Sequence, residues 1–141
     1  PQVMSQYWNM PEETRNVFTA DGYFRSGDIG MMDVDGYVKI IDRKKDMIIV
    51  SGFKVFPNEV EEVLSLMPGI LECAVIGIPD DETGEAVKAF IVKEYEHLTE
   101  EQVLAYCKQQ MTNYKRPKKI IFRSDLPKSN VGKILRRELR D

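Results

Sequence analysis

The chain has 141 residues, 43% of them hydrophobic and 30% charged, which is typical of a globular protein rather than a disordered or membrane-spanning one. No apolar run approaches the roughly 20 residues that cross a bilayer, and a single histidine, His97, argues against a histidine-based metal site or catalytic triad. The two cysteines, Cys73 and Cys107, lie in apolar patterns, which predicts buried free thiols in a reducing compartment.

The net charge of −3 conceals an uneven distribution. Residues 1–105 carry 9 lysines and arginines against 20 acidic residues, whereas residues 106–141 carry 11 against 3. This difference predicts a basic patch on an acidic body. Because such a patch attracts phosphates, the candidate partners are a nucleotide, a phosphate-rich coenzyme, an anionic membrane surface or nucleic acid.

The first third of the chain predicts a short helix and a hairpin. Residues 11–15 begin with proline and two acidic residues, which favours the first turn of a helix. Strands are expected at residues 29–32 and 37–41, because the Asp-Gly pair at 35–36 is a strong hairpin signal. Five consecutive charged residues follow at 42–46, and we interpret this run as a linker.

After this run the pattern restarts, which divides the chain into residues 1–45 and residues 46–141. Thr99 and Gln102 have the spacing of a capping box, a reciprocal pair that begins a helix. Apolar periodicity predicts helices at 57–67 and 99–111, and strands at 47–50, 53–56, 71–78, 86–92 and 119–122. The resulting β-α-β-β-α-β order predicts an α+β fold in which helices pack on one small sheet.

In the run at residues 127–139, one lysine, Lys133, directly follows Gly132 and precedes an amphipathic stretch. A lysine at a glycine hinge can deliver its ammonium transiently to a phosphate or carboxylate. The alternative is a frayed basic terminus without a function.

Two further residues suit nucleotide binding, although neither is specific alone. Asp28, after a glycine, could accept hydrogen bonds from two vicinal ribose hydroxyls. Arg43 offers a planar fork for a phosphate or a ribose oxygen, or else forms a surface pair with Asp42 or Asp46.

The order of several motifs resembles that of long-chain fatty acid–CoA ligases, which belong to the acyl-adenylate-forming superfamily. The matching runs are DGYFRSGDIG at 21–30, GYVKIIDRKKD at 36–46, SGFKVFPNEVE at 51–61 and PKSNVGKILRREL at 127–139. The resemblance implies that residues 1–45 are the hairpin that ends a large AMP-binding N-terminal domain. Residues 46–141 would be the small, mobile C-terminal domain.

The implied enzyme converts a fatty acid, ATP and CoA into acyl-CoA, AMP and pyrophosphate. ATP and Mg²⁺ would be bound mainly by an N-terminal domain that this chain lacks, CoA would be a substrate, and no metal ligand is expected within the chain. The chain is therefore expected to be inactive alone. We expect a cytoplasmic enzyme, with peripheral association at the inner membrane face left open.

The resemblance also implies roles for individual residues on the nucleotide side. Asp28 matches the carboxylate that binds the ribose hydroxyls, and Arg43 matches an arginine that contacts the nucleotide. Lys45 occupies the hinge about which the C-terminal domain rotates between the two half-reactions.

Further roles are implied for the second part of the chain. Gly52 matches the glycine beside the tunnel for the pantetheine arm, which Phe53 and Lys54 would help to line. Lys133 matches the lysine that bridges the ATP phosphate and the substrate carboxylate during adenylation.

Some positions depart from the family pattern. Gln6 replaces an expected glycine, Tyr23 a tryptophan and Ser26 a threonine. Ile49 stands where some relatives have a lysine that assists thioester formation, so that role stays unassigned.

Two alternatives remain open from the sequence. The acyl pocket lies outside this chain, so the ligase could instead act on aryl or on short- or medium-chain acids. A non-catalytic module that binds anions or nucleic acid is the alternative from another class, although the chain lacks the aromatic platforms of single-strand binders.

Overall fold

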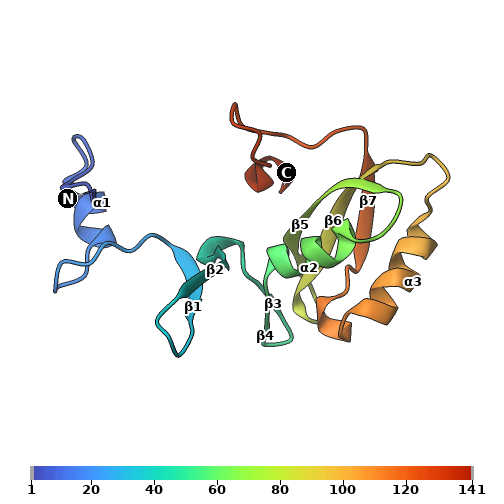
Figure 1. Cartoon of the computed structure of the whole chain (residues 1–141), viewed down its shortest axis with the longest axis horizontal. Helices are drawn as coiled ribbons and strands as arrows, with labels where there is room; N and C mark the ends of the chain where they lie inside the picture. The colour runs from blue at the N-terminus through green and yellow to red at the C-terminus, as the bar shows by residue number, and fades with distance from the viewer. Residues whose placement is uncertain (1, 141) are drawn as a thin grey trace. The chain divides into compact units, whose positions relative to one another are not determined.

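A computed structural model describes residues 2–140. The chain divides into two compact units, Pro1–Lys45 and Asp46–Asp141 (Figure 1). Among the described residues, the buried hydrophobic side chains all lie between Ile48 and Leu139, in the second unit. The described part of the first unit, residues 2–45, therefore has no buried hydrophobic core.

The first unit contains one α-helix and a two-stranded antiparallel sheet: α1 (Pro11–Val17), β1 (Asp28–Met32) and β2 (Val38–Arg43). In the turn between the strands, the Asp33 carboxylate accepts the backbone N–H groups of Asp35 and Tyr37 at 3.0 and 2.9 Å. Gly36 has a φ of +86°, a conformation that glycine adopts without strain. The predicted hairpin is confirmed.

The charged run at 42–46 is only partly the expected linker. Asp42 and Arg43 belong to β2, and only Lys44–Asp46 leave the strand, as one 3-10 turn (η1). The strand continues past its predicted end because both strands of this small sheet are edges, where charged residues are well tolerated.

The second unit has the predicted order of strands and helices. Its elements are β3 (Ile48–Val50), β4 (Phe53–Val55), α2 (Pro57–Ser65), β5 (Ile70–Asp80), β6 (Gly84–Lys93), α3 (Glu100–Gln110), η2 (Asn113–Lys115), β7 (Lys119–Arg123) and η3 (Arg136–Leu139). Strand β6 is central: β5 pairs with one edge, while β7, in parallel, and the end of β3 pair with the other. The α+β class is confirmed.

The helix boundaries follow local signals closely. The Thr99 hydroxyl accepts the Gln102 N–H at 3.3 Å, and the Gln102 side chain accepts the Thr99 N–H at 3.0 Å, so the capping box begins α3 as predicted. Helix α2 ends at Ser65, two residues before its predicted end. The N–H groups of Leu66 and Met67 bond three residues back, which tightens the chain into a 3-10 turn.

Successive strand residues point to opposite sides of the sheet, so the sheet has two faces of side chains. Both faces carry buried apolar residues. The two helices, α2 and α3, cover one face, where the fully buried residues include Val60, Leu64, Val75, Val87, Ile91, Val103 and Cys107. The buried residues on the other face are Ala74, Ile76, Phe90, Val92, Leu126 and Leu139.

Helices therefore cover only half of the sheet, and the C-terminal segment (residues 124–140, red in Figure 1) covers the rest. Leu126 and Leu139 of this segment are 3% and 2% exposed, and Ile134 packs against the same cluster. The alternative of a frayed basic terminus is wrong, because apolar side chains anchor the segment near both of its ends. The helices among residues 2–140 are too short and too polar to cross a membrane.

Candidate functional site

Asp28 and Arg43, the two candidate nucleotide ligands, face each other across β1 and β2. They are register partners, and Nε of Arg43 lies 2.9 Å from Oδ1 of Asp28. The Arg43 side chain is 59% exposed and that of Asp28 27%, so both keep surface that a ligand can reach. The Asp42 carboxylate accepts the backbone N–H of Arg43 at 2.7 Å.

An open cleft of about 510 Å³ lies beside this pair, lined by Ser26, Gly27, Arg43, Lys44 and Lys45. The Lys44 N–H donates to the Gly27 carbonyl at 2.8 Å, which holds the chain after β2 against the loop before β1. Three cations line the cleft, so it favours an anionic ligand. Lys44 was not predicted from the motifs, although its place in the charged run next to Arg43 was a usable signal.

Gly52 lies in the tight turn between β3 and β4, which we call the glycine turn (residues 50–53). Ser51 and Gly52 have φ values of +49° and +84°, the left-handed pair typical of a type I′ hairpin turn. A side chain on Gly52 would meet no atom within 4 Å, so the space beside it is open. The exposed residues Phe53 and Lys54 follow directly.

The loop from Asp80 to Glu85 supports the glycine turn. The Ser51 N–H donates to the Thr83 carbonyl at 2.8 Å, and the Ile49 N–H donates to the Glu85 carboxylate at 2.6 Å. The Thr83 hydroxyl contacts both Oδ1 of Asp80 and the Glu85 carbonyl at 2.8 Å. These bonds hold β3 to β6 where the backbone strands pair only once, at Val50–Gly84.

Asp80 is itself fixed by a lysine. Lys118 lies 2.6 Å from Oδ2 of Asp80, and hydrogen bonds from Lys118 and Thr83 lower the pKa of Asp80 to about 2. The same contacts, together with Glu82, raise the pKa of Lys118. Asp80 therefore stays ionised as an acceptor in the loop under all but strongly acidic conditions.

An aromatic pair and an exposed apolar side chain lie near the glycine turn. The Phe53 ring stacks on Tyr114, with centroids 4.6 Å apart and planes 17° from parallel. Ile49 on β3 is 46% exposed and presents a hydrocarbon side chain at its position. Tyr114 was not predicted, because it lies far from Phe53 in sequence and outside the matching motifs.

Lys133 closes a second turn, which we call the lysine turn (residues 128–134). Lys128 and Ile134 form a β-bridge at its base. The Ser129 N–H donates to the Lys133 carbonyl at 2.8 Å, and the Gly132 N–H donates to the Ser129 carbonyl at 2.9 Å. The Lys133 N–H also donates to the Ser129 hydroxyl at 3.2 Å. The Lys133 side chain is exposed and has no ion pair among residues 2–140, so its charge is available to a ligand.

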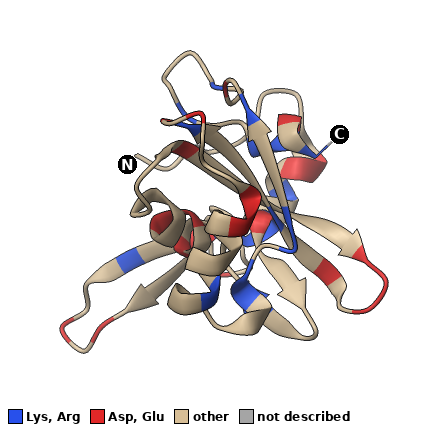
Figure 2. Ribbon diagram, turned by 90° about the vertical axis from the view of Figure 1, so that its right-hand side faces the viewer, with Lys and Arg blue, Asp and Glu red and all other residues tan. Residues whose placement is uncertain are grey.

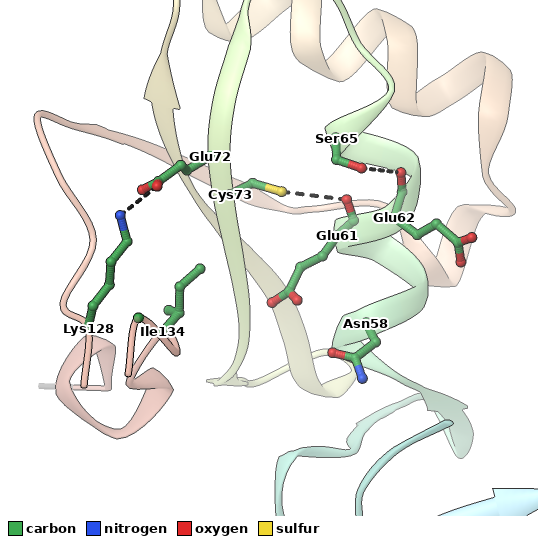
Figure 3. Close-up of a pocket in the computed structure, with 9 residues that line it drawn as sticks. Asn58, Glu61, Glu62, Ser65, Glu72, Cys73, Lys128 and Ile134 are labelled. Carbon is green, nitrogen blue, oxygen red and sulfur yellow. Dashed lines mark hydrogen bonds and ion pairs between the residues drawn. The ribbon is translucent and has the colours of Figure 1, made fainter. Parts of the chain in front are cut away.

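A cavity of about 380 Å³ lies between the lysine turn, helix α2 and strand β5 (Figure 3). On one side, Lys128 reaches across to Glu72 of β5 at 2.5 Å. On the other side, the Cys73 thiol donates to the Glu61 carbonyl at 3.5 Å. Burial raises the pKa of Cys73 to about 12, so this thiol is protonated at neutral pH and is a poor nucleophile.

The two predicted buried thiols are confirmed, because Cys73 and Cys107 are both free and buried. Burial also raises the pKa of Cys107, to about 11. Neither group is a candidate for covalent chemistry.

The basic C-terminal quarter, predicted as a basic patch on an acidic body, is partly neutralised by ion pairs. Many of its cations pair with carboxylates of the acidic body (charges in Figure 2). The pairs are Lys115–Glu59, Lys118–Asp80, Lys128–Glu72, Arg136–Glu61 and Arg140–Asp46, at 2.5 to 2.7 Å. This pairing weakens the argument for a nucleic-acid-binding module, because paired cations contribute less to phosphate binding.

The predicted site residues fall in both units. Asp28, Arg43 and Lys45 belong to the first unit and line or adjoin one cleft. Gly52, Phe53, Lys54 and Lys133 belong to the second, on the β3–β4 hairpin and the C-terminal segment. No group of three or more His, Cys, Asp or Glu side chains that could hold a metal ion occurs among residues 2–140.

The chain was compared with known proteins. Residues 59–133 match the model of the AMP-binding enzyme C-terminal domain. The whole chain is 57% identical to 25% of a long-chain-fatty-acid–CoA ligase of Yersinia pestis, and 99% of it is 45% identical to 27% of the long-chain-fatty-acid–CoA ligase FadD13 of Mycobacterium tuberculosis. The crystal structure of ATP-bound MatB from Rhodopseudomonas palustris is similar to 98% of the chain, with a TM-score of 0.92 and 43% sequence identity. The match covers 28% of the MatB chain.

The chain thus spans about a quarter of the length of the curated relatives it matches. The family model covers more than half of the chain, and it includes most of helix α2, the central strands and Lys133. These matches agree with the α+β fold, and the chain therefore belongs to the AMP-binding enzyme C-terminal domain family.

Proposed function

We propose that the chain is the C-terminal part of an ATP-dependent long-chain fatty acid–CoA ligase that forms acyl-CoA, AMP and pyrophosphate. The observation that carries the proposal is the end-to-end similarity to long-chain ligases. Support comes from three features that match the chemistry: the Asp28–Arg43 pair in a cationic cleft, an open glycine turn, and an exposed lysine on a closed turn.

Residues 1–45 are proposed to end the N-terminal AMP-binding domain, and residues 46–141 to form the mobile C-terminal domain. The boundary between the compact units, at Lys45 and Asp46, supports this division and the assignment of Lys45 as the hinge. A 3-10 turn spans this boundary. A change in a few backbone dihedral angles of such a turn is enough to rotate one domain relative to another.

In the first half-reaction, a carboxylate oxygen of the fatty acid attacks the α-phosphorus of ATP, and pyrophosphate leaves. Asp28 would accept hydrogen bonds from the ribose hydroxyls, and Arg43 would donate to the nucleotide. Lys133 would place its ammonium where negative charge accumulates between the carboxylate and the phosphate. Such preorganised positive charge is often the largest contribution to catalysis.

In the second half-reaction, the CoA sulfur attacks the carbonyl carbon of the acyl-adenylate, AMP leaves, and the thiol proton is released. Rotation about Lys45 would withdraw Lys133 and bring in the glycine turn. Gly52, flanked by Phe53 and Lys54, would leave space for the pantetheine arm, in keeping with the open volume at this glycine.

ATP and CoA are the proposed small-molecule partners, together with the fatty acid and the N-terminal domain. The described residues offer no cluster for Mg²⁺, so that ion would be held by the N-terminal domain and the nucleotide phosphates. Without that domain the chain should be inactive. The free buried thiols fit the cytoplasm, and peripheral binding at the inner membrane face is a further proposal about the whole enzyme.

The test replaces Lys133 by alanine in the complete ligase and measures the two half-reactions separately. Adenylation should fall by about 10²–10³, or on the order of 3–4 kcal/mol, because a positive charge is lost from the transition state. Attack of CoA on supplied acyl-adenylate should be retained. Lys119→Ala removes another exposed lysine and should change neither step.

An equal loss in both half-reactions would overturn the role of Lys133. A panel of acids tests the substrate: preference for an aryl or short-chain acid over palmitate would replace the long-chain assignment. Binding of nucleic acid by the chain, with no ligase activity in the complete protein, would overturn the proposal as a whole.

A further inference from the structure

We infer that Arg136 is a positioning residue for Lys133, and that it fixes the lysine turn to Asp46, next to the proposed hinge. This inference rests on the proposed function, because it assumes that the ammonium of Lys133 must be held in a defined place during adenylation. It concerns a residue that contacts Glu61, Asn58 and Asp46.

Arg136 binds helix α2 through two hydrogen bonds to one carboxylate, that of Glu61. Its Nε lies 3.0 Å from Oε1 of Glu61, and its Nη2 lies 2.6 Å from Oε2 of the same carboxylate. Nη2 also donates to the side-chain oxygen of Asn58 at 2.6 Å. The Arg136 and Glu61 side chains are only 17% and 19% exposed, so salt screens this pair less than an ordinary surface pair.

Glu61 is in turn held by the sheet. Its Oε1 accepts the backbone N–H of Val75 at 2.8 Å, which joins α2 to the buried strand β5. Arg136 therefore attaches the C-terminal segment to a carboxylate whose position is already fixed from a second direction. A guanidinium with its planar fork suits such a site better than a flexible ammonium.

The same arginine reaches the start of the second unit. Nη1 of Arg136 lies 3.7 Å from the Asp46 carboxylate, and Nη2 of Arg140 lies 2.6 Å from it. The Asp46 side chain is 11% exposed. Because Asp46 directly follows Lys45, these pairs join the lysine-bearing segment to the point about which the domain is proposed to rotate.

A second ion pair holds the opposite side of the lysine turn. Lys128, at the base of the turn, pairs with Glu72 of β5 (Figure 3). Lys133 thus lies between two anchors on different elements, one on β5 and one on α2 and Asp46. In a rotation about Lys45, the lysine turn would therefore move together with the rest of the second unit, and Lys133 would keep its position within that unit.

The experiment compares Arg136→Gln with Arg137→Gln in the complete ligase. Arg137 is the neighbouring arginine and a matched control. Its side chain is 78% exposed, and its ion pair with Glu138 is long, with Nη2 3.7 Å from Oε1. Arg136→Gln should lower adenylation by about 10- to 100-fold through misplacement of Lys133, while the use of supplied acyl-adenylate changes little. Arg136→Lys, which keeps the charge, should recover part of the loss.

A second measurement does not depend on ligase activity. In the 141-residue chain, NMR order parameters of the Gly132 and Lys133 amides should fall from about 0.85 toward about 0.6 in Arg136→Gln, but not in Arg137→Gln. Amides of α3 should not change, which excludes general unfolding. Where Arg136→Gln does not fold, Arg136→Lys, which loses the two-point contact with Glu61 but keeps the charge, should show a smaller fall in the same order parameters.

Unchanged order parameters in the lysine turn would overturn the inference, as would an equal loss of both half-reactions in Arg136→Gln. If the order parameters fall but Lys133→Ala itself has no selective effect on adenylation, the anchoring by Arg136 stands and the proposed function of Lys133 fails.

Discussion

The glycine turn and the lysine turn belong to the same unit, yet different forces fix them. The glycine turn depends on its own left-handed dihedral angles and on hydrogen bonds from the adjacent loop at residues 80–85. The lysine turn is closed by its backbone but located by ion pairs to α2 and β5. The comparison teaches that a turn can be shaped locally and still depend on distant charges for its place.

Matched glycine substitutions test the comparison most strongly. Gly52 and Gly132 have φ values of +84° and +79°, and a side chain on either would meet no atom within 4 Å. Gly52→Ala and Gly132→Ala should therefore each cost about 1–2 kcal/mol of stability through backbone strain alone. Urea unfolding of the chain measures both.

The activities of these two variants should differ although their stabilities do not. In the complete ligase, Gly52→Ala should slow thioester formation, and Gly132→Ala should slow adenylation, each on the order of tenfold. If both variants lose the same half-reaction, the two turns do not have separate roles.

Carboxylate substitutions with and without salt give a smaller effect. Glu85→Ala removes the acceptor of the Ile49 N–H and should cost about 1–2 kcal/mol at any ionic strength, because a hydrogen bond to the backbone is lost. Glu72→Ala removes the partner of Lys128 and should cost less than about 1 kcal/mol, since both side chains are a third or more exposed.

The salt dependence separates these two losses. In about 1 M NaCl, where the Debye length is about 3 Å, the cost of Glu72→Ala should largely disappear and that of Glu85→Ala should persist. A common salt dependence would mean that the two turns are held by the same kind of force.

The smallest effect concerns acid. The folded-state pKa of Asp80 is about 2, below the usual value, so its contribution to stability is present at neutral pH and is lost progressively as the pH falls from the ordinary aspartate pKa through about 2. Lys118→Gln removes the main cause and should raise the pKa of Asp80. NMR titration of the Asp80 carboxyl carbon measures the shift, and an unchanged pKa would show that Lys118 does not hold this loop.

Local features were predictable from the sequence. The capping box at Thr99 and the Asp-Gly turn at 35–36 place their own backbone bonds within a few residues, so the pattern alone finds them. The candidates Asp28, Arg43, Gly52 and Lys133 came from motif order, and the structure gives each an environment compatible with its proposed role.

The long-range contacts were not predictable from one sequence. Arg136 and Glu61 are 75 residues apart, and Lys128 and Glu72 are 56 apart, so no spacing rule links them. Sequence separation also explains why the covering of the second face of the sheet was not predicted. Leu139 packs against residues of β5 and β6 that are far from it in the sequence. A basic C-terminal quarter therefore looked like a free patch, whereas much of it consists of partners for earlier carboxylates.

The burial of Leu139 has a consequence for how the protein is made. Residues 48–120 supply the side of the core that the helices cover, but the second face of their sheet stays uncovered until Leu139 has been translated and has left the ribosome. During that interval, apolar side chains such as Ile76 and Phe90 are open to other nascent chains and to chaperones. A stop codon between positions 126 and 139 would preserve α2, α3 and about nine-tenths or more of the sequence, and yet should yield a product that the cell degrades.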